Sequence, residues 1–146
     1  MTGPTRMTAA QYRAMPKPKR AGMTEAQLHR AVASYLNAAL PKDAVWTTVG
    51  HGGGGKVRGA QLKAMGLRAG WPDVQILWNG EFYGIELKTV KGRSSPEQDA
   101  CMEAIFEAGG RYETIRSLDE LQDWLRMLCM PLRVDLDTPS RKRSRA

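Results

Sequence analysis

The hydrophobic and polar positions along the chain change period several times, from helical spacing to short apolar runs and back. Thr24 precedes apolar residues three and four apart, and Gln27 completes a capping-box pattern, so we expect a helix from Thr24 to about Pro41. Short runs rich in Val, Ile, Trp and Thr predict strands, and further helical periods predict helices. The predicted strands are 44–49, 74–78, 81–88 and 111–116, and the other predicted helices are 60–66, 95–108 and 118–130.

The dipeptide Asn79-Gly80 makes the most specific local prediction. Between two apolar runs it indicates a two-residue hairpin loop. Trp78 then lies opposite Glu81, and counting outward places Asp73 opposite Glu86. Lys88 shares the face of Glu86, because side chains on a strand alternate with a period of two. Asp73, Glu86 and Lys88 should therefore meet at one end of one face, with the apolar residues of both strands turned to the core.

The order of these elements predicts the fold class. A strand–helix–strand step follows the hairpin, and such a step joins parallel strands. We expect an α/β domain with a central mixed β-sheet of about four strands flanked by helices.

Charge changes the picture at the two ends of the chain. The net charge is +7, yet residues 1–22 hold five basic side chains and no acid, and residues 131–146 hold five basic side chains and two acids. The remaining residues, 23–130, therefore carry a net charge of −1. We expect a disordered basic arm (1–22), a folded domain (23–130) and a basic C-terminal tail (131–146). Such arms suit a polyanion such as DNA; solvated tails are the alternative.

Composition indicates a soluble protein. Hydrophobic residues make up 42% of the chain and charged residues 25%, and no apolar run approaches the ~18 residues of a membrane span. No apolar segment follows the basic N-terminal residues, so no secretory signal is expected. Cys101 and Cys129 lie among apolar residues and are expected to be buried, reduced thiols. Together these features predict a cytoplasmic protein without a membrane partner.

Two opposed carboxylates repel each other unless a positive charge lies between them. Mg²⁺ is the expected cation, because carboxylate oxygens, a backbone carbonyl and water suit it. The predicted ligands are the carboxylates of Asp73 and Glu86 and the backbone carbonyl of Leu87. Such an ion can activate water and polarise a phosphoryl oxygen. Lys88 could orient the attacking water or balance the charge of the transition state. The alternative is an ordinary surface acid beside a Glu–Lys pair.

These residues also resemble a known motif. Pro72-Asp73 followed by Glu86-Leu87-Lys88 is similar to the PD-(D/E)XK nuclease motif. The surrounding segments resemble the VRR-NUC (virus-type replication-repair nuclease) family over about residues 24–125. They are Gly70-Trp71-Pro72-Asp73-Val74, Gly84-Ile85-Glu86-Leu87-Lys88, Ser94-Ser95-Pro96-Glu97-Gln98 and Gly109-Gly110.

The resemblance implies a restriction-endonuclease-like core, dependence on Mg²⁺ or Mn²⁺, and cleavage of DNA. It also implies a homodimer and branched or Holliday-junction-like substrates in phage-type replication, recombination or repair. Through it, Glu25 matches an additional N-terminal acid and a further metal ligand, and Gln98 matches a glutamine of the site. A favourable helix dipole and a capping box explain these two residues equally well. Trp71 departs from the family, where a smaller apolar residue is expected.

Basic residues around the motif are candidates for contacts with DNA phosphates, with solvated surface as the alternative for each. They are Lys56, Arg58, Lys63, Arg68, Lys91 and Arg93. The segment from Gly50 to Lys56 imitates a phosphate-binding P-loop, but Val57 stands where Ser or Thr is required. A non-catalytic nucleic-acid-binding module and a restriction-type endonuclease remain as alternative functions. The latter needs a base-reading element, for which the chain has little room.

Overall fold

The computed structural model describes residues 22–49 and 55–137. The predicted basic arm, the glycine-rich loop and the end of the C-terminal tail lie almost wholly outside these residues. The elements are α2 (Glu25–Ala39), β1 (Val45–Thr48), α3 (Gly55–Ala64), β2 (Val74–Trp78), β3 (Glu81–Leu87), α4 (Pro96–Glu107), β4 (Arg111–Ile115) and α5 (Leu118–Met127). In this part of the chain, no helix is long and apolar enough to cross a membrane.

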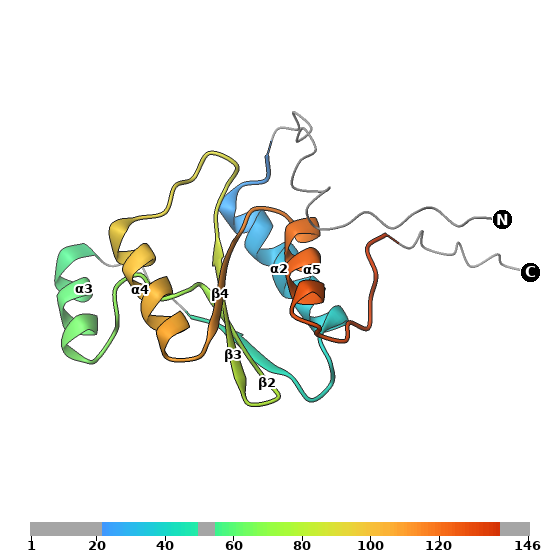
Figure 1. The fold of residues 1–146 in the computed structure, drawn as a ribbon. Coiled ribbons are helices and arrows are strands. Elements are labelled where there is room, and N and C mark those ends of the chain that lie inside the picture. Colours follow the sequence, from blue (N-terminus) through green and yellow to red (C-terminus); the bar gives the residue numbers. More distant parts are fainter. Residues whose placement is uncertain (1–21, 50–54, 138–146) are drawn as a thin grey trace, which may run out of the picture.

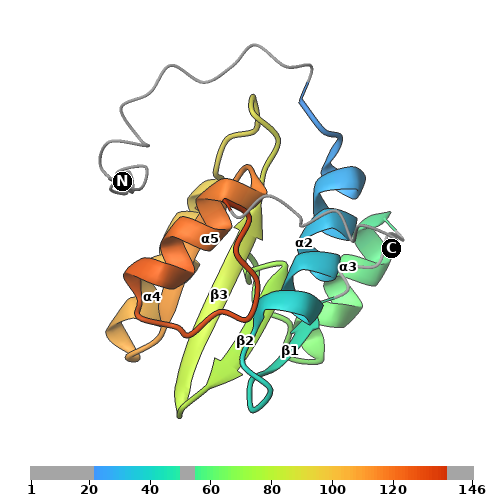
Figure 2. The same cartoon turned by 90° about the vertical axis from the view of Figure 1, so that its right-hand side faces the viewer.

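The described strands form one sheet in the order β1-β2-β3-β4. The pairs β1–β2 and β2–β3 are antiparallel, whereas β3 and β4 are parallel. Helices α2 and α5 cover one face of the sheet and α4 lies on the other (Figures 1 and 2). The predicted fold class, an α/β domain with a mixed four-stranded sheet between helices, is confirmed.

The hairpin has the predicted register. Its pairs run from Trp78↔Glu81 at the loop to Val74↔Ile85 at the far end. Asn79 and Gly80 have φ angles of 51° and 76°, as the left-handed two-residue turn of a hairpin requires. Because the turn at Asn79-Gly80 fixes the register, it also determines which side chains of β3 point towards α4.

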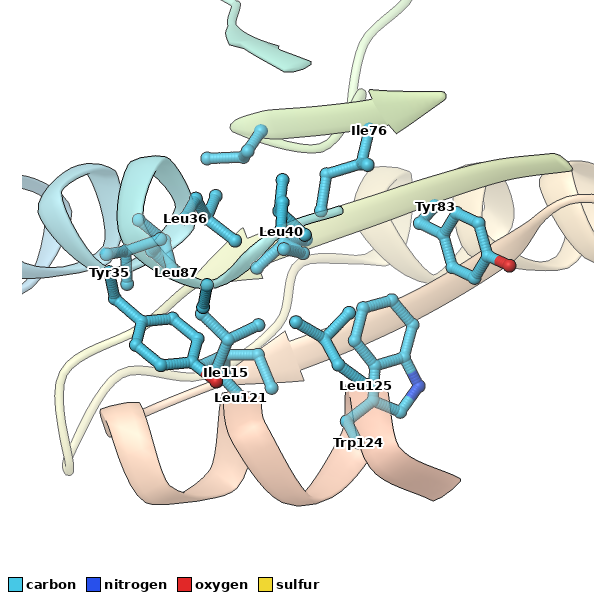
Figure 3. Close-up of a cluster of buried hydrophobic side chains, with 14 of the residues drawn as sticks. Tyr35, Leu36, Leu40, Ile76, Tyr83, Leu87, Ile115, Leu121, Trp124 and Leu125 are labelled. Carbon is cyan, nitrogen blue, oxygen red and sulfur yellow. The ribbon is translucent and has the colours of Figure 1, made fainter. Parts of the chain in front are cut away.

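The main core lies between the sheet and the helices α2 and α5 (Figure 3). Its sheet side is the predicted apolar face of the hairpin, which includes Val74, Ile76, Tyr83 and Ile85. The ring of Tyr83 meets that of Trp124 edge-on at 6.2 Å. A smaller cluster of Cys101, Ile105 and Tyr112 packs between α4 and the opposite face. Strand β3 is consequently buried on both sides, which allows it to carry a shielded polar side chain.

Several predicted details are wrong. Helix α3 begins at Gly55, not near residue 60, and none of its residues is buried. Helix α5 ends at Met127, before the expected residue 130, and Cys129 has a φ of 61° that no helix can continue. The Cys129 side chain is exposed, whereas Cys101 is buried as expected. The helical period of residues 95–108 also predicts Ala100 and Ala108 in the core, but both are exposed because α4 buries only a narrow stripe.

Residues 131–137, expected to belong to the tail, lie on the folded domain. The backbone N–H of Arg133 donates to the Ala39 carbonyl at 2.8 Å. Its guanidinium donates to the carbonyls of Leu40 (2.6 Å) and Asn37 (2.8 Å). These contacts satisfy carbonyls at the C-terminal end of α2. This arginine therefore caps a helix, although its charge was counted among those available for a polyanion.

Two adjacent residues of β2 test the assignment of the core face. Ile76 is fully buried whereas Leu77 is 55% exposed. We expect Ile76→Ala to lower the free energy of unfolding by about 2–5 kcal/mol, because it leaves a cavity among packed side chains. Leu77→Ala should change it by about 0.5 kcal/mol or less. Urea denaturation of both variants measures this difference, and equal losses would show that the faces are misassigned.

Candidate active site

Asp73, Glu86 and Lys88 meet at the open end of the hairpin, as predicted. The Asp73 carboxylate accepts a hydrogen bond from the backbone N–H of Leu87 at 2.8 Å. The Lys88 ammonium lies 3.5 Å from Oε1 of Glu86. The last pair of the β2–β3 ladder is Val74↔Ile85, directly next to Asp73 and Glu86 in the chain. The side chain of Asp73 thus continues the strand pairing and remains attached to the end of β3.

Glu86 is the buried member of the group, with only 4% of its surface exposed. Its Oε1 accepts a hydrogen bond from the Gln98 amide at 2.5 Å, and its Oε2 accepts one from the Tyr112 hydroxyl at 3.5 Å. Burial and then the negative charge of Asp73 raise the pKa of Glu86 from 4.5 to about 7, although Lys88 opposes the rise. The positive charge of Lys88 therefore does not balance the negative charges of Asp73 and Glu86.

Gln98 performs two structural tasks with its two amide atoms. Its Oε1 accepts from the backbone N–H of Ser95 at 3.0 Å, while the Ser95 hydroxyl accepts from the Gln98 N–H at 3.2 Å. This capping box begins α4. The Nε2 atom is left to donate to Glu86. Gln98 therefore caps α4 and contacts Glu86 at the same time, so capping does not exclude a place beside Glu86.

Two glycines allow the segment before Asp73 to approach its neighbours closely. Gly70 has a φ of +79°, and a Cβ there would lie 2.2 Å from the Glu97 carbonyl oxygen in the first turn of α4. A Cβ at Gly84 on β3 would lie 2.7 Å from Pro72. A side chain at Gly70 would clash with the backbone of α4, and one at Gly84 would clash with the Pro72 ring. Both glycines therefore determine where Asp73 stands relative to Glu86.

A cavity of about 390 Å³ opens beside the two acids. Its lining residues come from α3, the segment before β2, β3 and the start of α4: Lys63, Ala69, Gly70, Trp71, Asp73, Glu86, Ser95, Glu97 and Gln98. Trp71 packs against Phe82, with ring centroids 5.6 Å apart. Among the residues predicted to contact DNA, Lys63 contributes directly to this wall.

The donor set fits a hard divalent cation. Mg²⁺ commonly takes one or two carboxylates and completes its shell with water and phosphate oxygens. Asp73 and Glu86 supply the carboxylates. The N–H and C=O of one strand residue point to the same side, so the Leu87 carbonyl is directed towards the side on which its N–H meets Asp73. Within residues 22–49 and 55–137, no group of three or more His, Cys, Asp or Glu is arranged to hold a metal.

Other predicted residues lie farther from this pair. Glu25 is exposed in the first turn of α2 and does not line the cavity, so the structure does not add it to the two acids. Lys56 and Arg58 are exposed on α3, outside the cavity wall. Arg68 opposes the rise that burial causes in the pKa of the Cys101 thiol. The remaining two, Lys91 and Arg93, are exposed on the segment after Lys88.

The sequence reasoning missed Tyr112, Glu97 and Ser95 as members of the site. Glu97 was noted only as part of the segment that resembles the nuclease family, and Ser95 as part of that segment and as a helix cap. Tyr112 reaches Glu86 from β4 because the parallel register pairs Gly84 with Tyr112 and Glu86 with Thr114. No local motif reports that register, since the loop between α4 and β4 does not set it as the hairpin turn does. The available signal was Tyr112 itself, a polar aromatic residue in the strand predicted over residues 111–116.

Alanine substitutions at Gly70 and Gly66 distinguish a steric clash from the strain of a positive φ. Gly70→Ala must accommodate both a positive φ and a clash with the Glu97 carbonyl, whereas Gly66 has a φ of +102° and open space around it. We expect Gly66→Ala to cost about 1–2 kcal/mol of unfolding free energy. Gly70→Ala should cost more and should weaken Mn²⁺ binding. Equal losses of stability in the two variants, measured by denaturation, would contradict the proposed close approach to α4.

The raised pKa of Glu86 predicts how the stability of the metal-free protein depends on pH. The folded state holds this proton more tightly than the unfolded state, so the stabilisation is full below about pH 4.5 and is lost as pH rises through about 7. The difference is worth up to about 3 kcal/mol. Denaturation in EDTA at pH 5 and pH 8 should show this slope in the wild type and a smaller one in Glu86→Gln. Identical slopes would be inconsistent with a buried, titrating Glu86.

Comparison with known proteins adds a fold relationship to this geometry. No family model and no curated protein sequence matches the chain. A solved structure described as "VRR_NUC domain protein" is similar in fold, with a TM-score of 0.57 and 19% sequence identity. The similarity covers 74% of this chain and 89% of that chain. The domain therefore has an α/β fold of the kind found in that VRR_NUC domain protein.

Proposed function

We propose that this protein is a Mg²⁺- or Mn²⁺-dependent DNA nuclease of the VRR-NUC type, which hydrolyses phosphodiester bonds. One observation carries the proposal: the hairpin brings the carboxylates of Asp73 and Glu86 to one end of β3, with the Lys88 ammonium 3.5 Å from Glu86. The fold similarity and the Pro72-Asp73 … Glu86-Leu87-Lys88 motif support it.

The carboxylates of Asp73 and Glu86 and the Leu87 carbonyl would hold the cation. When bound, the ion would supply Lewis-acid polarisation of a phosphoryl oxygen and a water of lowered pKa. Gln98 and Tyr112 hold the Glu86 carboxylate from two directions, so it cannot rotate away. Such supporting contacts are commonly worth 10–100-fold in metal affinity or activity.

Lys88 is the catalytic cation in this proposal. Its ammonium is partly exposed and lies 3.5 Å from Oε1 of Glu86, which lines the cavity where the phosphate would bind. There it would orient the attacking water through one N–H and offset the charge that develops on the phosphoryl oxygens. The ammonium has three donors, so it can keep its contact with Glu86 while it performs this task.

The substrate and assembly belong to the same proposal. Lys63 at the cavity, and Lys91 and Arg93 on the exposed segment after Lys88, can contact the phosphates that flank the scissile bond. The resemblance to VRR-NUC proteins favours branched or Holliday-junction-like DNA, a homodimer, and a cytoplasmic role in phage-type replication, recombination or repair. The basic residues near both chain ends would add affinity independent of sequence.

Cleavage of labelled junction, flap, single-stranded and duplex DNA with Mg²⁺ and with Mn²⁺ tests the proposal. We expect metal-dependent cleavage that falls by at least about 100-fold in Asp73→Asn, Glu86→Gln and Lys88→Met, because each removes a metal ligand or a charge of the transition state. The exposed α4 residue Glu107 provides a matched control, since Glu107→Gln also neutralises a carboxylate.

Two results would contradict this account. Unchanged cleavage in purified, folded Asp73→Asn and Lys88→Met would remove these residues from the chemistry. Metal-independent binding of DNA without cleavage of any substrate would instead identify a non-catalytic binding module on the same scaffold. Glu25→Gln, assayed in parallel, decides whether that residue joins the site when DNA and metal are bound.

A further inference from the structure

The chain folds back directly after Lys88. The backbone N–H of Gly92 donates to the Thr89 carbonyl at 3.0 Å, which closes a turn over residues 89–92. One nitrogen of the Arg116 guanidinium donates to the carbonyls of both Thr89 (2.5 Å) and Gly92 (2.7 Å). Hydrogen bonds from an ionised donor are shorter and stronger than neutral ones. A single side chain therefore holds both ends of the turn.

Arg116 is itself attached to two elements. It follows β4, whose last residue, Ile115, accepts a hydrogen bond from the backbone N–H of Lys88 at 3.1 Å. The backbone N–H of Arg116 donates to the Glu120 carboxylate at 2.9 Å. Glu120 lies in the first turn of α5, where its N–H donates to the Ser117 hydroxyl at the N-cap. The guanidinium thus extends from a backbone fixed by β3, β4 and α5.

The turn lies against the side chain of Lys88. A Cβ placed on Gly92 would lie 3.3 Å from the Cδ atom of Lys88, so the Gly92 backbone already borders the aliphatic part of that side chain. Lysine is a point charge on a flexible four-carbon stem and loses entropy when it is held in one geometry. A wall beside the stem removes alternative rotamers and favours the contact with Glu86.

We propose that Arg116 is a positioning residue, whose guanidinium holds the turn 89–92 against Lys88 and thereby keeps the Lys88 ammonium beside Glu86. Its effect on catalysis rests on the proposed function, in which Lys88 acts on the phosphate. Arg116 lies outside every motif segment that resembles the nuclease family, and it reaches the site only through the parallel pairing of β3 and β4.

Arg116→Met tests the proposal, because methionine keeps an aliphatic side chain and removes every donor. We expect kcat to fall about 10–100-fold, since small misplacements of a catalytic group have effects of this size. KM for DNA and Kd for Mn²⁺ should stay within about twofold. Arg126→Met is the matched control: Arg126 also anchors a chain segment, through Asp135 and Asp137, but does not contact the turn. Its kcat should be unchanged.

A double-mutant cycle separates positioning from general destabilisation. If Arg116 acts through Lys88, adding Arg116→Met to Lys88→Met should cause no further loss of kcat. Gly92→Ala gives a second, milder perturbation. Gly92 does not have a positive φ, so alanine is compatible with its backbone conformation. The new Cβ would lie 3.3 Å from both the Lys88 Cδ and the Thr89 hydroxyl, so it would crowd the Lys88 stem and the turn. We expect a several-fold loss of kcat that likewise disappears without Lys88. Equal losses in both backgrounds would overturn the proposal.

Two readouts do not depend on cleavage. Hydrogen exchange of the Gly92 amide should accelerate in Arg116→Met and not in Arg126→Met. The NMR signals of the Lys88 ε-methylene should lose their distinct chemical shifts and sharpen as the side chain becomes mobile. An unchanged Lys88 spectrum in Arg116→Met would refute the positioning role even in an active nuclease. If the wild type cleaves no DNA, the proposed function fails, and these spectra still decide whether Arg116 positions Lys88.

Discussion

The burial of the Glu86 carboxylate is the constraint on which the rest of this site depends. A charge inside a protein is costly unless hydrogen bonds and opposite charges surround it, and Glu86 is only 4% exposed. Three elements supply what it needs: Gln98 from α4, Tyr112 from β4 and Lys88 from the end of its own strand. Asp73 works in the opposite direction, since its charge raises the pKa of Glu86 further. A pair of carboxylates placed in this way is unfavourable alone and becomes favourable when a divalent cation joins it.

The two faces of the sheet differ: one carries most of the apolar core, and the other carries the polar residues of the site. The face covered by α2 and α5 holds the larger apolar core, in which Tyr83, Ile85 and Leu87 of β3 take part. The other face has the smaller cluster beneath α4, and polar residues can approach β3 beside it. The lack of a Cβ at Gly70 and Gly84 lets the segment before β2 lie close to the α4 backbone and lets its Pro72 ring lie close to β3. The apolar packing on the first face thus stabilises the fold, although the repulsion between Asp73 and Glu86 on the second face opposes it.

How much of this the sequence predicts depends on whether the controlling signal is local. Asn79-Gly80 determines a register, so the meeting of Asp73, Glu86 and Lys88 followed from the sequence alone. The capping residues Thr24 and Ser95 likewise marked two helix starts correctly. The contacts of Tyr112 and Arg116 depend on the parallel pairing of β3 with β4, which no turn residue encodes. Helix α3 was placed too late in the chain because it buries no residue, and an apolar period is then no guide. The role of Glu25 was inferred from resemblance and stays a prediction.

The central claim is that Asp73 and Glu86 hold a divalent cation at the end of β3. Anomalous diffraction from crystals of the wild type soaked in Mn²⁺ tests it directly, without any assumption about the substrate. A cation bound there should give one strong peak at about 2.0–2.3 Å from carboxylate oxygens of Asp73 and Glu86 and from the Leu87 carbonyl oxygen, with the remaining ligands supplied by water. A saturated crystal with no density there, and with the Lys88 ammonium still the nearest cation to Glu86, would contradict it.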